Sequence, residues 1–124
     1  MKEENIVTEE LDEEIEIDGH QIKTIKFDLE HINRGWDKDN HDYNPEADRR
    51  SNYSAEDIVE FFEQLGYYAI DWDEGVNKNE VEVRGRKRTR YYAYIYDHDA
   101  EKQKKMIIDI PEDFDSEGII ITVY

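Results

Sequence analysis

The clearest periodic pattern in the chain lies in the stretch SAEDIVEFFEQLG, residues 54–66. Its large apolar residues recur at spacings of three and four, as on one face of a helix: Ile58, Phe61, Phe62 and Leu65. Ser54 is a favourable N-cap, Asp57 stands where a capping box needs an acceptor, and Gly66 is placed to end the helix. The pattern predicts one amphipathic helix that packs on a flat apolar surface.

In most of the remaining chain, apolar and polar residues alternate, which is typical of β-strands. The stretch IEIDGHQIKTIKF, residues 15–27, predicts a hairpin that turns at Asp18-Gly19. Five further strands are predicted after the helix, at residues 67–73, 80–87, 88–99, 104–111 and 118–124.

The alternation also assigns side chains to strand faces. The longest strand is expected to carry Tyr92, Tyr94 and Tyr96 on one face. Its other face is expected to carry Tyr91, Ala93 and Ile95. In the last two strands, the residues expected to share a face are Met106, Ile108 and Ile110, and then Ile119, Ile121 and Val123.

The order of two strands, a loop, a helix and five strands predicts an α+β fold. We expect a single antiparallel β-sheet, connected as a meander, with one main helix packed on a face. Residues 1–14 are expected to be an acidic, flexible lead-in, although the four-residue spacing of Val7, Leu11 and Ile15 leaves a short helix open. Residues 15–124 are expected to form a single domain.

The composition fits a small folded domain that lacks thiol chemistry. The 124 residues suit one core, and an aromatic content of 12% argues against disorder. There is no cysteine, so disulfides and zinc thiolate sites are excluded. No apolar run approaches the roughly 20 residues that span a bilayer, and the acidic N-terminus is unlike a signal peptide. We therefore expect a cytoplasmic protein with no membrane partner.

The net charge of −17 is unevenly distributed. Residues 1–18 carry nine acids and one lysine, whereas residues 84–105 carry eight basic and three acidic residues. The whole chain should repel nucleic acid at long range, but a basic segment can still meet a phosphate because distant charges are screened.

The basic segment RGRKRTR is the first candidate site. Alternation would place its arginines on one side of an extended segment, with Tyr92 continuing the row, and Lys87 adds charge. Arginine beside rings suits single-stranded RNA. The predicted RNA- or phosphate-binding residues are Arg84, Arg86, Lys87, Arg88, Arg90 and Tyr92. The alternative is an edge hairpin whose cations neutralise the acidic part of the same chain.

The long polar stretch at residues 31–50 begins with the second candidate, His31-x-x-Arg34. Three residues apart on a helical turn, they would share a face, where histidine can transfer protons and arginine can stabilise phosphate charge. The alternative is a surface histidine beside an arginine that pairs with Glu30 or Asp37.

Two further features complete the candidate chemistry. Thr122 and Tyr124 are expected to share a face of the last strand, where they are either site hydroxyls or half-exposed positions. No metal and no cofactor is predicted, because the histidines show no metal-ligand spacing: His20, His31, His41 and His98.

His31-x-x-Arg34, the Ser-Ala-Glu-Asp helix start and the ending Ile-Ile-Thr-Val-Tyr resemble the RelE-like superfamily of small toxin ribonucleases, which also includes colicin-type tRNases and EndoU-like toxins. The resemblance implies an antiparallel sheet with N-terminal helical elements and metal-independent cleavage of mRNA or tRNA. It implies His31 as general acid or base, Arg34 and one of residues 86–90 on phosphate, and Thr122 and Tyr124 in positioning roles. RNA, including RNA on the ribosome, and a cognate antitoxin would then be partners.

The acidity of the chain supports a competing hypothesis of another class. A non-catalytic acidic protein could present carboxylates in place of phosphates and so block a basic nucleic-acid-binding protein, as phage-type inhibitors do. The sequence leaves both hypotheses open.

Overall fold

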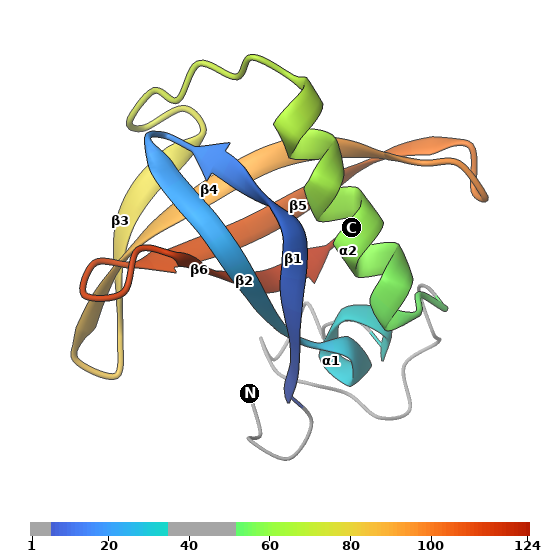
Figure 1. Cartoon of the computed structure of the whole chain (residues 1–124), viewed down its shortest axis with the longest axis horizontal. Helices are drawn as coiled ribbons and strands as arrows, with labels where there is room; N and C mark the ends of the chain where they lie inside the picture. The colour runs from blue at the N-terminus through green and yellow to red at the C-terminus, as the bar shows by residue number, and fades with distance from the viewer. Residues whose placement is uncertain (1–5, 35–51) are drawn as a thin grey trace, which may run out of the picture.

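The computed structural model describes residues 6–34 and 52–124 (Figure 1). Six strands form one sheet in the order β1-β2-β6-β5-β4-β3. The elements are β1 (Ile6–Ile17), β2 (His20–Asp28), α1 (Leu29–Arg34), α2 (Ala55–Gln64), the 3₁₀ helix η2 (Leu65–Tyr67), β3 (Lys78–Val83), β4 (Arg86–Asp97), β5 (Lys102–Pro111) and β6 (Glu117–Val123).

The predicted antiparallel meander is wrong, because the sheet is mixed. β6 lies between β2 and β5 and runs parallel to β2, with Thr24 opposite Glu117 and Phe27 opposite Ile120. The other neighbouring strands pair antiparallel. The burial of β6 agrees with its central place, since every residue from Glu117 to Ile120 is buried, as in strands covered on both faces.

Residues 67–73 do not form the predicted strand. After η2 the chain runs without regular structure to β3. The amide side chain of Asn77 holds this segment, since it donates to the Asp71 carbonyl over 2.8 Å and accepts the Asp73 N–H over 2.7 Å. These contacts form a turn in place of a strand ladder. Leu65 is the C-cap of α2, so Gly66 follows the helix at C′ as predicted, and it lies within η2.

The acidic segment from Ile6 onward belongs to β1, which pairs with β2 along most of its length. The register shifts between Glu10 and Ile15, so the two halves of β1 meet β2 in different registers. Val7 and Leu11 are half-buried against the core, which explains why this charged stretch is ordered as a strand. The Asp18-Gly19 turn of the predicted hairpin is confirmed, with φ of 52° and 86°.

The predicted helix is confirmed in its N-cap and its buried face. The Asp57 N–H donates to the Ser54 hydroxyl over 3.2 Å, and the Ser54 N–H donates to the Asp57 carboxylate over 2.9 Å. The buried stripe consists of Ile58, Phe61, Phe62 and Leu65. It packs against the inner face of the sheet and completes the core.

The inner face of the sheet follows the predicted alternation in β4 and β5 but not in β6. The buried side chains include Tyr91, Ala93 and Ile95, and then Met106, Ile108 and Ile110. In β6 an irregularity opposite Ile107 and Ile108 shifts the register, so Ile120 and Val123 are buried and Ile121 is only half-buried.

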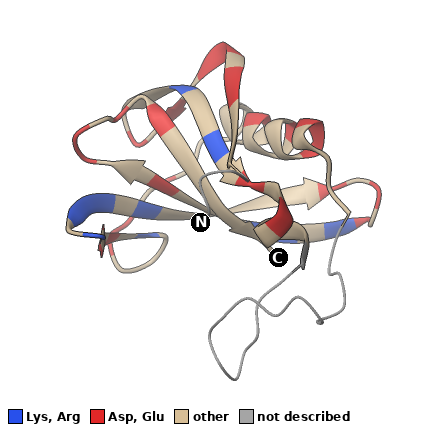
Figure 2. Cartoon of the chain, turned by 90° about the horizontal axis from the view of Figure 1, so that it is seen from below, with Lys and Arg blue, Asp and Glu red and all other residues tan. Residues whose placement is uncertain are grey.

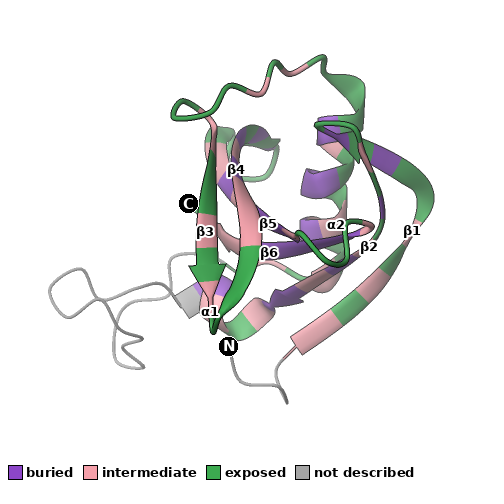
Figure 3. Ribbon diagram, turned by 90° about the vertical axis from the view of Figure 1, so that its left-hand side faces the viewer, coloured by how far each residue is buried: buried purple, intermediate pink, exposed green. Residues whose placement is uncertain are grey.

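The sheet is strongly curved (Figure 3), and the tip of the β1–β2 hairpin lies beside the start of β3 (Figure 1). Asp18, in the β1–β2 turn, accepts a bond from Lys78 Nζ over 2.9 Å and another from the Tyr91 hydroxyl over 2.9 Å. β1 and β3 are the two edge strands, so this contact closes the curve across the whole sheet. Within residues 6–34 and 52–124, no helix has the length and apolar character needed to cross a membrane.

Candidate functional site

The predicted RNA-binding arginines lie in and after the β3–β4 turn, and the structure divides them into two groups. Arg84 is in the turn with φ 54° beside Gly85 with φ 78°, so the segment bends where an extended row was expected. Arg86 and Lys87 are exposed, and Arg86 lies 3.7 Å from the exposed carboxylate of Asp113. This outer group is accessible to a ligand, and a surface pair of this kind is weak.

Arg88 and Arg90 form the second group and bind a buried acid of the same chain. Arg90 donates from Nε and Nη2 to the two oxygens of Asp109, over 2.7 and 2.9 Å. Arg88 Nη1 lies 3.4 Å from the same carboxylate, whose side chain has no exposed surface. The hydrogen bond to Asp109 raises the pKa of Arg90, although burial opposes it. These two cations therefore balance an internal charge.

The tyrosine row of β4 is oriented as predicted. Tyr94 and Tyr96 are exposed, and Tyr92 is half-buried. All three lie on the face of β4 opposite to that of the buried Tyr91. Lys105 Nζ, from β5, lies 5.6 Å from the centre of the Tyr92 ring and 5.8 Å from that of Tyr94. A cation over two rings gives this face a mixed aromatic and basic character.

The rings border a groove of about 760 Å³ along the β3-side edge of β4. Its opposite wall comes from the loop between η2 and β3, including Tyr68, Ile70 and Val76. Sequence reasoning missed this groove because it depends on the irregular path of residues 68–77, which was predicted to be partly a strand.

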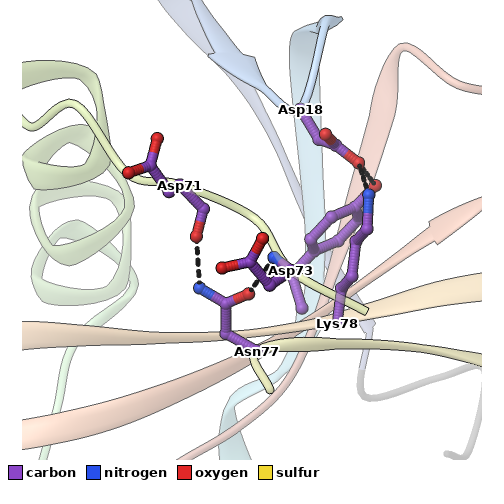
Figure 4. Close-up of polar contacts among 6 residues, drawn as sticks. Asp18, Asp71, Asp73, Asn77 and Lys78 are labelled. Carbon is purple, nitrogen blue, oxygen red and sulfur yellow. Dashed lines mark hydrogen bonds and ion pairs between the residues drawn. The ribbon is translucent and has the colours of Figure 1, made fainter. Parts of the chain in front are cut away.

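A second pocket, of about 530 Å³, adjoins the groove and shares Tyr68 and Ile70 with it. Its lining includes four acids: Glu16, Asp18, Asp71 and Asp73. In Figure 4, Asp18 engages Lys78 while Asp71 and Asp73 use main-chain atoms in their bonds to Asn77. The carboxylates of Asp71 and Asp73 have no cation partner in the part of the chain that the structure describes.

Burial and hydrogen bonding both act on the pKa of Asp18 in this pocket. Burial would raise the pKa, but hydrogen bonds from Lys78 and Tyr91 outweigh it and lower the value. The pKa of Tyr91 is raised, by burial first and then by its bond to Asp18. At neutral pH the carboxylate is therefore charged and the tyrosine neutral, which is the state that this hydrogen bond requires.

The predicted catalytic residues come from two elements that lie in contact. α1, with His31 and Arg34, packs against β6, which carries Thr122 near its end. The His31 N–H donates to the Asp28 carboxylate over 3.1 Å, so Asp28 caps α1. Arg34 is the last residue of α1, and its side chain lies outside the described atoms.

Thr122 lies opposite Ile107 of β5 and is half-exposed. The main chain of Tyr124 exchanges bonds of 2.7 and 2.9 Å with Lys105, and half of the Tyr124 residue is exposed. The side chains of Thr122 and Tyr124 make no hydrogen bond with the described residues. Both hydroxyls are therefore available to a ligand.

A polar link that the sequence did not suggest joins α1, α2 and the β4–β5 turn. The Asn33 side chain donates to the Tyr53 carbonyl over 2.9 Å and accepts the Tyr53 N–H over 2.7 Å. The Tyr53 hydroxyl donates to Asp97 over 2.8 Å, and Asp97 also accepts the N–H groups of Asp99 and Ala100. The only signal in the sequence is Tyr53 just before the capping box.

No metal-binding group is formed by the described residues: among residues 6–34 and 52–124, no three histidine or acidic side chains lie close enough to hold a metal ion. His41 and most of the polar stretch after Arg34 lie outside the described residues. No family model, no curated protein and no solved structure matches this chain.

Proposed function

We propose that this chain is a non-catalytic acidic protein that binds a basic nucleic-acid-binding protein in place of nucleic acid. The observation that carries the proposal is the outer face of α2, where Glu56, Glu60 and Glu63 are exposed. None of these three carboxylates has a cation partner among the residues described. At about 1.5 Å of rise per residue they form a row of negative charges a few ångströms apart.

The C-terminal end of this row is unfavourable for the helix, which supports a role in binding. A helix C-terminus favours cations, yet the last turn of α2 has no basic residue and contains Glu63. Figure 2 shows acidic positions on the helix and on most connecting loops, whereas basic positions lie mainly on strands. With Arg88 and Arg90 bound to Asp109, the charge available to a partner is predominantly negative.

The test is retention of basic proteins by the immobilised chain. Lysate proteins that bind heparin would be applied at low salt, and bound proteins would be eluted with duplex DNA or RNA and then with salt. We expect nucleic-acid-binding proteins to be retained, displaced by either polyanion, and released steeply with salt. Retention that nucleic acid does not displace would contradict the proposal.

A matched pair of variants locates the binding face. Substituting Glu56, Glu60 and Glu63 with glutamine removes three charges from α2, and substituting Glu10, Glu13 and Glu14 removes three from β1. We expect the first variant to lose at least about 10-fold in affinity and the second to lose much less. Equal losses would show that net charge alone attracts the partner.

A metal-independent endoribonuclease is the second candidate, because α1 packs against β6. That packing supports a shared site for His31 with Thr122 and Tyr124, with the exposed residues Arg86 and Lys87 contributing to RNA binding elsewhere on the surface. The resemblance to RelE-like toxins is part of this second proposal.

A further inference from the structure

The edge of β4 is open over a short segment between two capped positions. β3 ends its pairing where Lys78 meets Tyr91, and the Tyr92 N–H then donates to the Asn77 carbonyl over 2.9 Å. Four residues further on, the side-chain amide of Gln64 binds both main-chain groups of Tyr96, each over 2.8 Å. Gln64 therefore occupies the place that a neighbouring strand would take.

Tyr94 lies between these two capped positions. Its partner in β5 is Lys105, whose N–H and carbonyl both bind Tyr124 on the far side of β5. Main-chain groups alternate in direction along a strand, so the N–H and carbonyl of Tyr94 point toward the open edge. They have no hydrogen bond to the described part of the chain.

This segment lacks the protection that the other edges have. Exposed positions of the outer strands carry carboxylates, such as Glu13 and Glu14 in β1 and Glu80 and Glu82 in β3. Charged side chains on an edge oppose pairing with another chain. Residues 92–96, Tyr-Ala-Tyr-Ile-Tyr, contain no charge and form one wall of the 760 Å³ groove.

The walls of the groove suit the side chains of an added strand. Tyr94 is 59% exposed and Val76 78% exposed, so large apolar surface faces solvent on both walls. Asn77 and Gln64 bound the open edge, so only a short extended segment of a peptide, centred opposite Tyr94, can pair there, with its side chains pointing alternately into the groove and away from it. Lys105 Nζ lies over the Tyr92 and Tyr94 rings on this wall, so apolar or aromatic side chains, and not basic ones, suit the groove itself.

The acidic residues beside the groove favour a partner that carries a basic residue. The acidic pocket continues from the groove through Tyr68 and Ile70, and the Asp71 and Asp73 carboxylates there have no cation partner among described residues. A basic residue at one end of the bound segment would meet them. A second copy of this chain would bring another net charge of −17 to the same surface, which disfavours self-pairing.

We propose that the open edge of β4 at Tyr94 binds an extended segment of a basic partner protein, which adds to the sheet as a strand. Two hydrogen bonds to Tyr94 fix the register, alternate apolar side chains enter the groove, and an arginine or lysine reaches Asp71 and Asp73. This inference rests on the proposed function for the nature of the partner.

The test begins with a library of random nine-residue peptides displayed on phage and selected against the purified chain. We expect selected peptides to alternate apolar residues and to carry a basic residue near one end. Their synthetic versions should perturb the amide resonance of Tyr94 more than that of Thr89, which faces β5. Failure to select any such peptide, or perturbation confined to other surfaces, would overturn the proposal.

Tyr94→Pro is the central variant, because it removes an N–H that has no bond within the described chain. Proline is tolerated at edge positions whose N–H points outward. We expect at least about a 10-fold loss of peptide affinity, and Tyr94→Phe should lose little. Unchanged affinity of a folded Tyr94→Pro variant would overturn the proposal.

Asp71→Asn with Asp73→Asn is a second variant, in the loop, which keeps the proposal testable if Tyr94→Pro does not fold. We expect about a 10-fold loss for peptides with the basic end and little change once that end is replaced by glutamine. Equal effects on both peptides would overturn the assigned orientation.

The two proposals can fail separately. If Tyr94→Pro still retains the heparin-binding proteins as well as the unmodified chain does, the strand-addition site is wrong and the acidic binding function stands. If the unmodified chain retains no such protein while the selected peptides bind at Tyr94, the acidic binding function is wrong and the edge site stands.

Discussion

Arg90 binds both oxygens of Asp109, and the two residues differ in their access to water. The Asp109 side chain has no exposed surface, whereas about a quarter of the Arg90 side chain (27%) is exposed. Without its partner, the Arg90 side chain could turn toward solvent, whereas the Asp109 carboxylate would stay buried. Loss of the cation should cost more than loss of the acid.

Arg90→Ala should lower the free energy of unfolding by about 3–5 kcal/mol, because it leaves a buried carboxylate with only Arg88 at 3.4 Å. Asp109→Asn should cost less, about 1–2 kcal/mol, since both guanidinium groups can reach water. Urea unfolding measures both values. Arg86→Ala, which breaks an exposed pair, should change stability by less than about 1 kcal/mol. The reverse order for Arg90 and Asp109 would contradict this account.

Asp97 should make stability depend on pH in the acid range. Burial raises its pKa, but bonds from Tyr53, Ala100 and Asp99 outweigh this and lower it below the ordinary 3.8. A pKa lowered by folding gives stability that is present above about pH 4 and is lost as the pH falls through the folded value. The difference in unfolding free energy between the unmodified chain and Asp97→Asn should therefore shrink below about pH 4.

Urea unfolding at a series of pH values measures that difference. Asp99→Asn is the control, since Asp99 contributes its main-chain N–H and its exposed side chain is not part of the bond. Its effect should not follow the same pH dependence. A constant difference for Asp97→Asn from about pH 6 to pH 2 would argue against the bonded carboxylate.

Glu63→Lys should stabilise the fold while weakening partner binding. A cation in the last turn of α2 interacts favourably with the helix dipole, typically by about 0.3–1 kcal/mol. Glu56→Lys is the matched control, because the same change in the first turn should destabilise by a similar amount. Thermal unfolding measures both effects. If Glu63→Lys binds the heparin-retained proteins as well as the original chain, α2 is not the binding face.

The ribonuclease alternative makes a prediction of its own. If His31 is a general acid or base, purified protein should cleave total RNA in EDTA at defined positions. His31→Ala should then lower the cleavage rate by about 10²-fold or more. Mapping of the new RNA ends in both samples provides the measurement. Intact RNA with the unmodified chain would remove this candidate, and equal cleavage by both would remove the role of His31.

The features that the sequence predicted well depend on residues close together in the chain. The Ser54 and Asp57 capping box and the Asp18-Gly19 turn each involve at most a few neighbouring positions. The burial of Tyr91, Ala93 and Ile95 follows from simple alternation within one strand. Short-range sterics and hydrogen bonding decide such features, so they can be predicted without knowing the fold.

The features that could not be predicted depend on long-range contacts. The place of β6 beside β2 joins residues about 90 positions apart, and Asn77 converts a predicted strand into a loop. The candidate RNA-binding site was the feature predicted least well, because Asp109, the partner of Arg88 and Arg90, comes from another strand. Asp109 within the apolar stretch MIIDIP was the available signal, since a buried acid requires a cation.

The central place of β6 has a consequence for how the protein is made. The ribosome completes β1 and β2, and later β3, β4 and β5, before it reaches the strand that joins these two halves. Until then β2 and β5 each lack a neighbour, and both expose apolar edges. The pairings of β6 with β2 and β5 can therefore form only after nearly all of the described chain has emerged, and the β2–β6 pairing joins residues distant in sequence, a kind of contact that slows folding.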